Sequence, residues 1–232
     1  MMRRRSILVL AVVLLCWSTC FADLHDRGSG LIFDDVLDIT WLQNANYAQT
    51  SGYDSDGKML QADAVAWADQ LIYGGYSDWR LPHTLPVNPP NYNLTWSADG
   101  STDSAANIQS PNSEMAYMFY KNLGNLSYYE PGGSSPQTGW GLSNAGPFIN
   151  LQEYLYWSGS MAPGGSPTDA FYFSFEQGTQ HYNSYNWFYA WAVRDGDVAV
   201  TPIPVPGAAL LGFIGLATSA HVLRRRRKKA VA

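Results

Sequence analysis

The chain has 232 residues, with 14 lysines and arginines, 19 aspartates and glutamates, and two cysteines. Nine of these cations and both cysteines lie before residue 23 or after residue 223, so the segment between them, residues 23–200 and here called the body, has a net charge of −14 and no cysteine. Such a body disfavours nucleic acids and anionic polymers as ligands, and it excludes disulfides, thiolate metal sites and a cysteine nucleophile.

The first 22 residues have the pattern of a secretory signal peptide. Three arginines at residues 3–5 precede an unbroken apolar stretch over residues 7–15, and Cys20-Phe21-Ala22 surrounds a cut after Ala22. The apolar stretch is shorter than the roughly 20 residues that span a bilayer. A lipoprotein cut before Cys20 is the alternative, although the bulky Trp17 stands where such signals have small residues. We therefore expect export with removal of residues 1–22.

The first half of the body predicts a hairpin and two helices. Residues 31–33 and 39–42 are β-prone runs around an Asp-rich turn, which is typical of a hairpin. Apolar residues recur at helical spacing over residues 57–75, where Gly74 and Gly75 end the pattern. A second helix is predicted over residues 113–123, with Ser113 as its N-cap and a glycine after its last turn.

The second half of the body predicts strands, at residues 154–158, 170–176 and 186–193, of which the last two are expected to form a hairpin-like pair. Two long polar stretches, residues 83–112 and 125–150, are interrupted by Pro and Gly. Loops this long in a compact domain are often functional, so we expect them to help form any binding site. The element order predicts a compact single α+β domain with two helices, short antiparallel strands and long loops.

Residues 201–232 predict a membrane anchor. Pro202, Pro204 and Pro206 prevent a helix from extending upstream, and the apolar run at about 206–223 has no fully charged residue. Eighteen helical residues span about 27 Å, enough for a thin hydrocarbon core. The arginines and lysines at 224–229 should stay on the cytoplasmic side and leave the body outside. We therefore expect a transmembrane helix in the inner membrane.

The arrangement from Thr201 to Lys229 resembles a PEP-CTERM sorting signal, with "IPVP" in place of the Glu-containing motif. The resemblance implies an exosortase-like processing protease as a partner. Removal of the tail would transfer the protein from the inner membrane to the cell surface or extracellular matrix of a Gram-negative bacterium that makes exopolysaccharide. The missing Glu leaves the identity of the protease open, and a permanent anchor is the alternative.

Four stretches of the body carry a second resemblance: "LIFDDVLDITWLQNANY", "AWADQLIYGGYSDWRLP", "SEMAYMFYKNLGN" and "YWSGS…AFYFSFEQG…WAVRDGD". Together, from Leu31 to Asp197, they resemble the Lcl C-terminal domain family. The resemblance implies a C-type-lectin-like domain used in surface adhesion or carbohydrate binding. The sulfated polysaccharides implied for that family require a basic surface, so they do not suit a body of charge −14. The lectin calcium motifs Glu-Pro-Asn and Trp-Asn-Asp are also absent from the sequence.

Three charged residues in two of these stretches predict structural ion pairs. Asp78 and Arg80 lie in "GGYSDWRLP", and Arg194 lies in "WAVRDGD". An isolated buried charge costs several kcal/mol, so a buried arginine must be paired. We expect internal pairing of these residues with Trp79 in the core, and ligand binding by Arg80 is the alternative.

The segment "YDSDGK" at residues 53–58 starts like a calcium loop, with Asp54 and Asp56 as ligands. Lys58 stands where a third oxygen ligand belongs, and Val65 replaces the bidentate Glu at the twelfth position. An Asx turn explains the same two aspartates. We therefore expect no cofactor, and a calcium site would have to be assembled from distant carboxylates.

Aromatic residues beside Asn, Ser and Gln suggest a sugar-binding surface, because sugars are bound by ring stacking and by side-chain hydrogen bonds. Trp96 and Trp140 lie in the long polar loops and are the ligand-binding candidates. Trp191, on an expected strand, is assigned to the core instead.

The sequence predicts a protein without enzymatic activity. Neither a nucleophile-elbow motif nor a zinc-helix motif accompanies the body's three histidines. We expect a non-catalytic adhesion module that binds exopolysaccharide or another surface component. A glycan-acting hydrolase is one alternative, since paired carboxylates are not visible in a sequence. An acidic matrix protein that recruits divalent cations is the other.

Overall fold

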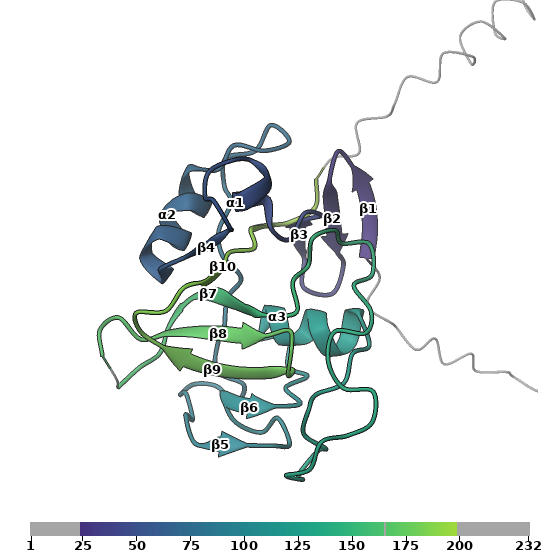
Figure 1. Ribbon diagram of the computed structural model, residues 1–232, viewed down its shortest axis with the longest axis vertical. Coiled ribbons are helices and arrows are strands. Elements are labelled where there is room, and N and C mark those ends of the chain that lie inside the picture. Colours follow the sequence, from purple (N-terminus) through teal and green to yellow (C-terminus); the bar gives the residue numbers. More distant parts are fainter. Residues whose placement is uncertain (1–23, 165, 199–232) are drawn as a thin grey trace, which may run out of the picture. The chain divides into compact units, whose positions relative to one another are not determined.

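The computed structural model describes residues 24–164 and 166–198, which make up nearly all of the body (Figure 1). The predicted signal peptide and the predicted membrane anchor lie outside the described residues. Within the described part, no helix has both the length and the apolar character needed to cross a membrane. The fold is a mixture of α and β structure in which strands outnumber helices, in agreement with the predicted class.

A four-stranded antiparallel sheet contains both ends of the described chain. Its strands are, in spatial order, β1 (Leu24–Gly28), β2 (Leu31–Asp34), β3 (Ile39–Leu42) and β11 (Val193–Asp195). The hairpin predicted from residues 31–42 is confirmed by the β2–β3 pairing. Its turn is stabilised by Asp34, because one carboxylate oxygen accepts the backbone N–H groups of Val36 and Leu37 at 3.1 Å.

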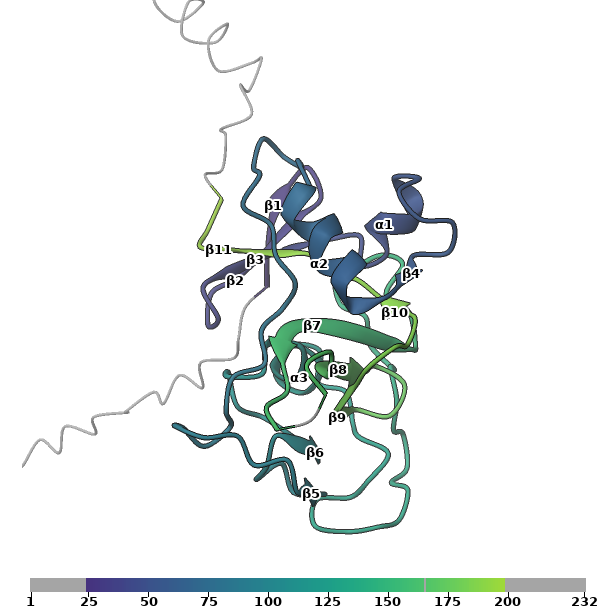
Figure 2. The same cartoon turned by 90° about the vertical axis from the view of Figure 1, so that its left-hand side faces the viewer.

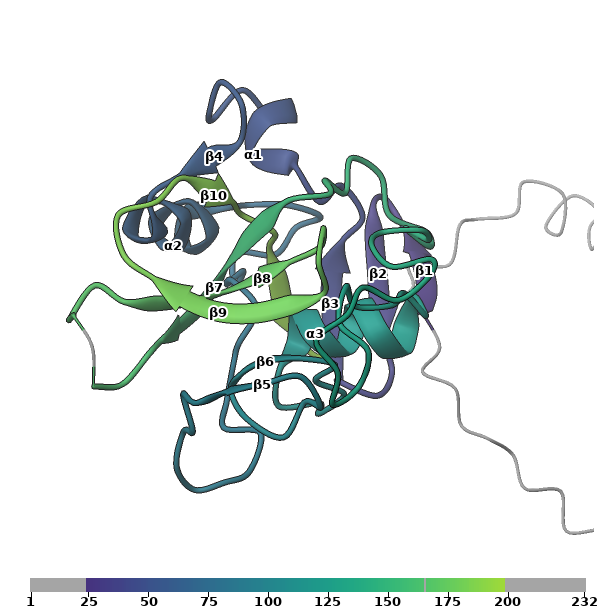
Figure 3. The ribbon, with the colours of Figure 1, turned by 60° about the horizontal axis from the view of Figure 1, so that its bottom comes forward.

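A second, seven-stranded sheet forms the centre of the body. Its strands are, in spatial order, β4 (Lys58–Met59), β10 (Phe188–Tyr189), β7 (Leu155–Met161), β8 (Ala170–Ser174), β9 (Thr179–Asn183), β6 (Ser104–Ala106) and β5 (Trp96–Ser97). Strands β7, β8 and β9 form an antiparallel meander, and Figure 3 shows α3 beside it. Figures 1 and 2 both place β5 and the β1–β3 sheet at opposite ends of the body.

The expected pairing of residues 170–176 with residues 186–193 is wrong. The partner of β8 is β9, because the chain reverses immediately after β8 at Gly178, whose positive φ of 64° suits a tight turn. Residues 186–193 instead contribute to β10 and to the start of β11, which belong to different sheets. The polar sequence of β9 concealed this strand, which lies next to β6 in the second sheet.

The helices are shorter than the sequence suggests. The first predicted helix, over residues 57–75, is limited to α2 (Gln61–Gln70), because residues 58–59 pair as β4 and Leu71 is extended. Gly74 and Gly75 do not end it; they form a turn closed by two 3.0 Å hydrogen bonds between Tyr73 and Tyr76. The structure adds a short helix, α1 (Tyr47–Thr50), which the sequence analysis did not predict.

The second predicted helix is present as α3 (Glu114–Tyr117), continued by the π-helical segment η1 (Met118–Asn122). Ser113 precedes it but makes no side-chain capping bond; its hydroxyl contacts Oε1 of Gln180 in the core instead. Phe119 of η1 packs against Phe173 of β8, with ring centroids 5.4 Å apart. The helix is therefore fixed by packing on the second sheet, not by its cap.

One apolar core joins both sheets. Trp41 of β3 packs on Trp191 at 4.5 Å between ring centroids, and Phe175 lies 5.9 Å from Trp191 on the side of the second sheet. Trp191 is fully buried, as the sequence analysis expected, and its indole N–H donates to the Leu42 carbonyl at 2.7 Å. Because this core is shared, the two sheets form one folded unit and hold the surface loops in fixed positions.

Candidate functional site

Five rings form a connected band on the surface of the described body. They are His181, Trp96, Tyr129, Tyr128 and Trp140, and together they are called the aromatic strip. Trp96 lies parallel to His181, with centroids 4.8 Å apart and an angle of 7° between the planes. The further steps from Trp96 through the two tyrosines to Trp140 are 5.4, 5.0 and 4.9 Å, all edge-to-face. Both tryptophans predicted to bind ligand therefore belong to one cluster.

The second sheet positions one end of the strip. β5 pairs with β6, with Trp96 opposite Ser104, and β6 pairs with β9, which carries His181. The Ser104 hydroxyl lies 3.1 Å from Nδ1 of His181, which fixes the orientation of the imidazole under the Trp96 ring. Trp96 is thus mounted on three hydrogen-bonded strands, although it lies in a segment that the sequence analysis treated as a loop.

The other end of the strip is an irregular hairpin over residues 126–141. Its arms are joined at Leu126 and Gly141, where the Gly141 N–H donates to the Leu126 carbonyl at 2.9 Å. Tyr128 and Tyr129 lie on one arm and Trp140 on the other. The hairpin is attached to the second sheet's β8–β9 turn, because the Tyr128 N–H donates to the carbonyl of Gln177 at 2.8 Å.

Asn107 connects the two ends of the strip. Its side-chain amide donates to the carbonyls of Ala98 and Tyr129 at 2.8 and 2.9 Å, so the loop after β5 and the hairpin are held together. Asn107 adopts φ = 60°, a left-handed conformation that asparagine tolerates better than most residues. This clamp fixes the contact between Trp96 and Tyr129 before any ligand arrives.

The strip is accessible and uncharged at neutral pH. Trp96 and Trp140 remain 41% and 38% exposed, although large aromatic side chains are usually well buried. Burial lowers the pKa of His181 below its ordinary value, so this imidazole is neutral at pH 7. Exposed rings in a connected patch are typical of binding surfaces.

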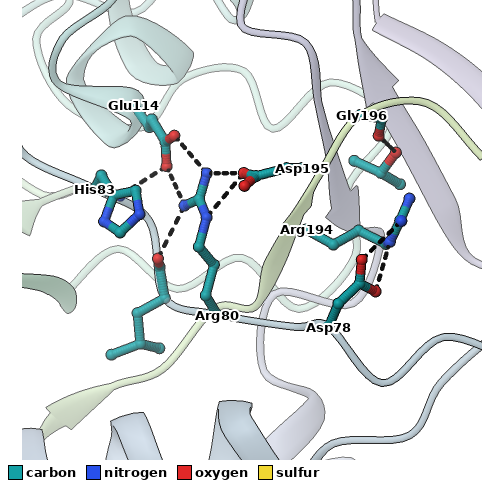
Figure 4. Close-up of polar contacts among 9 residues, drawn as sticks. Asp78, Arg80, His83, Glu114, Arg194, Asp195 and Gly196 are labelled. Atoms are coloured by element: carbon teal, nitrogen blue, oxygen red, sulfur yellow. Dashed lines mark hydrogen bonds and ion pairs between the residues drawn. The ribbon is translucent and has the colours of Figure 1, made fainter.

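The structure places the predicted charged residues in two groups of polar contacts, both shown in Figure 4. Arg80 forms two parallel 2.8 Å hydrogen bonds with Glu114, which lies at the start of α3, and a 3.0 Å bond from Nε to Asp195 of β11. Glu114 also accepts the backbone N–H of His83 at 2.7 Å. This cluster, here called the arginine cluster, connects a loop, a helix and the last strand.

The electrostatics of the arginine cluster favour the charged state of Arg80. Burial opposes its charge, but hydrogen bonds and attraction to Glu114 and Asp195 outweigh this, so the pKa of Arg80 lies above its ordinary value. Burial and the nearby Arg80 lower the pKa of His83. Trp79, next to Arg80, is 2% exposed and lies in the core.

Asp78 pairs with Arg194, the middle residue of β11. Two hydrogen bonds of 2.9 and 2.8 Å join the guanidinium to the carboxylate, and the guanidinium carbon lies 4.2 Å from the centroid of the Tyr76 ring. The hydrogen bond from Arg194 lowers the pKa of Asp78 below its ordinary value. Asp78, Arg80 and Arg194 therefore contact other residues of the body. The elements that carry these contacts are not those that carry the aromatic strip.

Asp54 and Asp56, the candidate calcium ligands, form two consecutive Asx turns. Asp54 accepts the N–H groups of Asp56 and Gly57 at 3.0 and 2.7 Å, and Asp56 accepts that of Lys58 at 3.0 Å. Among the residues that the structure describes, no group of three or more His, Cys, Asp or Glu side chains is placed to hold a metal ion.

Two pockets of the described body, of about 250 and 270 Å³, lie apart from both clusters. One is lined by Leu60, Gln61, Ala62, Met161, Pro167, Thr168 and Tyr185, and the other by Tyr47, Ser51, Tyr53, Trp67, Gln70, Leu71 and Ile72. Neither lining contains a carboxylate or an imidazole that would perform acid–base chemistry. The contact between Ser104 and His181 does not present a nucleophile either, because Ser104 is only 5% exposed.

Sequence reasoning identified both tryptophans of the strip but not its organisation. The role of Asn107 has no local sequence signal, because its two partners are backbone carbonyls 9 and 22 residues away. The stacking of His181 on Trp96 depends on the β6–β9 pairing, which the sequence analysis missed. In the comparisons with known proteins, no family model, no curated protein and no solved structure matches this chain.

Proposed function

We propose that the body is a non-catalytic binding module that holds a polysaccharide, such as exopolysaccharide, on the aromatic strip. The observation that carries this proposal is the connection of Trp96 to Trp140 through Tyr129 and Tyr128, with both tryptophans exposed. Aromatic faces stack on the apolar faces of sugar rings, and rings in a row suit the repeating units of one chain.

Pre-organisation supports this function. The Ser104–His181 contact fixes the ring on which Trp96 stacks, and the Asn107 clamp fixes the loop after β5 against the hairpin. Binding then orders few protein side chains, each of which would otherwise cost about 0.5–1.5 kcal/mol of affinity. Exposed hydroxyl groups in the same loops, such as that of Thr138, supply hydrogen bonds to sugar hydroxyls.

The location and the finer fold belong to the same proposal. The two sequence ends support export, anchoring in the inner membrane and release to the cell surface or matrix by an exosortase-like protease. The four motif stretches support a C-type-lectin-like variant of the mixed fold, related to the Lcl C-terminal domain family. A surface-delivered protein with an exposed aromatic band would contact the matrix polysaccharide directly.

The test is co-sedimentation of the full chain, in a non-ionic detergent, with exopolysaccharide from the producing cells, with and without calcium. Mass analysis of the polysaccharide follows its integrity. We expect retention of the protein with intact polymer, and at least a tenfold loss of affinity for Trp96→Ala and Trp140→Ala. Trp187→Ala is the matched control, because Trp187 is 58% exposed and precedes β10, near the opposite edge of the sheet from β5.

Three results would contradict the proposal. Shortened polysaccharide would indicate a hydrolase, and calcium-dependent self-association without polymer would indicate a cation-recruiting matrix protein. Equal losses from Trp96→Ala and Trp187→Ala would show that the aromatic strip is not the binding surface.

A further inference from the structure

Two carboxylates border the aromatic strip at the junction of its two parts. Asp99 follows Ala98 in the loop after β5, and Glu130 follows Tyr129 in the hairpin. Because Asn107 holds the carbonyls of Ala98 and Tyr129 on one amide group, these two acidic residues lie on adjoining loops beside the Trp96–Tyr129 ring pair. Both Asp99 and Glu130 are exposed.

A third carboxylate lies near the Trp140 end of the strip. A β-carbon on Gly141, the residue after Trp140, would be only 3.3 Å from Oε1 of Glu153, so this carboxylate lies against the Gly141 backbone. At the junction, the hydroxyl and N–H of Ser101 donate to Asp99 at 2.6 and 3.0 Å and lower its pKa. Asp99 therefore keeps its negative charge in mildly acidic solution.

Four of the five cations of the described body, all except Lys121, are engaged in contacts outside the aromatic strip. Arg27, Arg80 and Arg194 are held by the ion pairs with Asp197, Glu114 and Asp78, respectively. Lys58 lies over the rings of Tyr154 and Tyr189. None of the ion pairs or cation–π contacts found among the described residues brings a lysine or arginine to a ring of the strip, and His181 is neutral at pH 7.

We propose that the aromatic strip recognises a polysaccharide with free amino groups, of the glucosamine type, in preference to a neutral or an anionic glycan. This inference rests on the proposed function, because it names the ligand class of the same surface. A protonated amino sugar gains attraction to the bordering carboxylates, and its ammonium group interacts favourably with tryptophan faces. A neutral sugar gains the stacking alone, and a sulfated or uronic chain is repelled.

The test compares three β-1,4-linked hexasaccharides that differ only at carbon 2 of each sugar. They are the glucosamine hexamer with ammonium groups, the N-acetylglucosamine hexamer and cellohexaose with hydroxyl groups. Affinities for the full chain in a non-ionic detergent would be measured by calorimetry at pH 6. We expect the glucosamine hexamer to bind at least tenfold more tightly than cellohexaose, and this advantage to disappear at about pH 9, where sugar amines are neutral.

Variants assign the effect to the carboxylates. Asp99→Asn and Glu130→Gln should each weaken glucosamine-hexamer binding about threefold and the double variant about tenfold, while cellohexaose binding stays unchanged. Asp69→Asn is the matched control, because Asp69 is an exposed aspartate on α2. Trp96→Ala should weaken the binding of all the hexamers that bind.

The outcomes separate this inference from the proposed function. If cellohexaose and the glucosamine hexamer bind equally, and Trp96→Ala weakens both, the amino-sugar inference is wrong and the glycan-binding proposal stands. If the glucosamine advantage is as sensitive to Asp69→Asn as to Asp99→Asn, it reflects the overall charge of the body, and the assignment to the strip is wrong. If no hexamer and no exopolysaccharide binds, both proposals fail.

Discussion

The aromatic strip and the arginine cluster are both made by residues that are distant in the sequence, but they differ in how completely their groups are satisfied. In the arginine cluster, the Arg80 guanidinium is surrounded by Glu114, Asp195 and the Leu81 carbonyl, and its side chain is only 19% exposed. In the strip, His181 stacks on Trp96 and the other ring contacts are edge-to-face, while the two tryptophans keep about two-fifths of their surface free.

This difference distinguishes structure from recognition. A charged cluster whose donors and acceptors are all engaged has little left to offer a ligand, and its removal damages the fold. A row of partly exposed rings leaves aromatic surface free for a partner, and its fixed conformation lowers the entropic cost of binding. The comparison therefore predicts opposite responses of stability and binding in the two regions.

The largest expected effect is on stability, from Glu114→Gln in the arginine cluster. The substitution keeps the size of the side chain but leaves Arg80 half-buried without its main counter-charge, which should lower the free energy of unfolding by about 3 kcal/mol. Urea unfolding monitored by tryptophan fluorescence measures this loss. Under conditions where the variant is folded, its glycan affinity should be unchanged. If the variant instead loses affinity while its stability is unchanged, the arginine cluster is part of the binding site.

Asn107→Gly should affect both quantities. Glycine permits the positive φ of this position but removes the two amide hydrogen bonds that join the strip, so the free energy of unfolding should fall by about 2 kcal/mol. Glycan affinity should fall several-fold, because the ring pair is no longer fixed before binding. Unfolding curves and calorimetry on the same preparation compare the two. Unchanged affinity would show that the clamp is purely structural.

Acidification should lower the free energy of unfolding through protonation of His181, on which Trp96 stacks. Its folded-state pKa lies below the ordinary value of about 6.5, so the stability it contributes is fully present above pH 6.5 and is lost as pH falls through the folded pKa. The free energy of unfolding should therefore decrease between pH 7 and pH 5, and the decrease should be smaller in His181→Asn. His83 responds in the same direction and remains present in both proteins. An identical decrease in the two proteins would assign the effect to other groups.

The smallest effect is expected at the exposed ion pair between Asp78 and Arg194. Asp78 is 57% exposed on its side chain, so Asp78→Asn should cost only about 0.5 kcal/mol, and less in high salt. Because its folded pKa is lowered, this contribution is present above about pH 4 and is lost as pH falls further. Wild type and variant should thus converge in acid. A cost of several kcal/mol would show that the Asp78–Arg194 pair is as important for stability as the arginine cluster.

The parts of this fold that follow from local pattern could be predicted from the sequence. The β2–β3 hairpin has β-prone runs and an Asp-rich turn, and α3 has a clear apolar side. The extent of α2 could not be predicted, because residues 58–59 pair with β10, about 130 residues later in the chain. β9 was missed because its alternation is filled with Gln, His, Tyr and Asn, whose partners lie on β6 and β8.

The candidate site divides in the same way. Trp96 and Trp140 could be predicted because they are large aromatic residues in long polar loops, where a binding site was expected. Their connection depends on Asn107, on the tyrosine pair and on a parallel pairing of β5 with β6, each of which is a tertiary contact. For Asp78, Arg80 and Arg194, internal pairing was predicted from the cost of an isolated buried charge, but the identities of Glu114 and Asp195 as partners required the fold.

The last strands of the body also set the time at which its fold is completed. β10 lies between β4 and β7 in the second sheet, and β11 is the edge partner of β3 in the first, so both sheets wait for residues 188–195. A chain that emerges N-terminus first from a ribosome holds its earlier strands without their final neighbours until residues 188–195 are made. Completion of both sheets during synthesis is thereby delayed until almost the whole body is available.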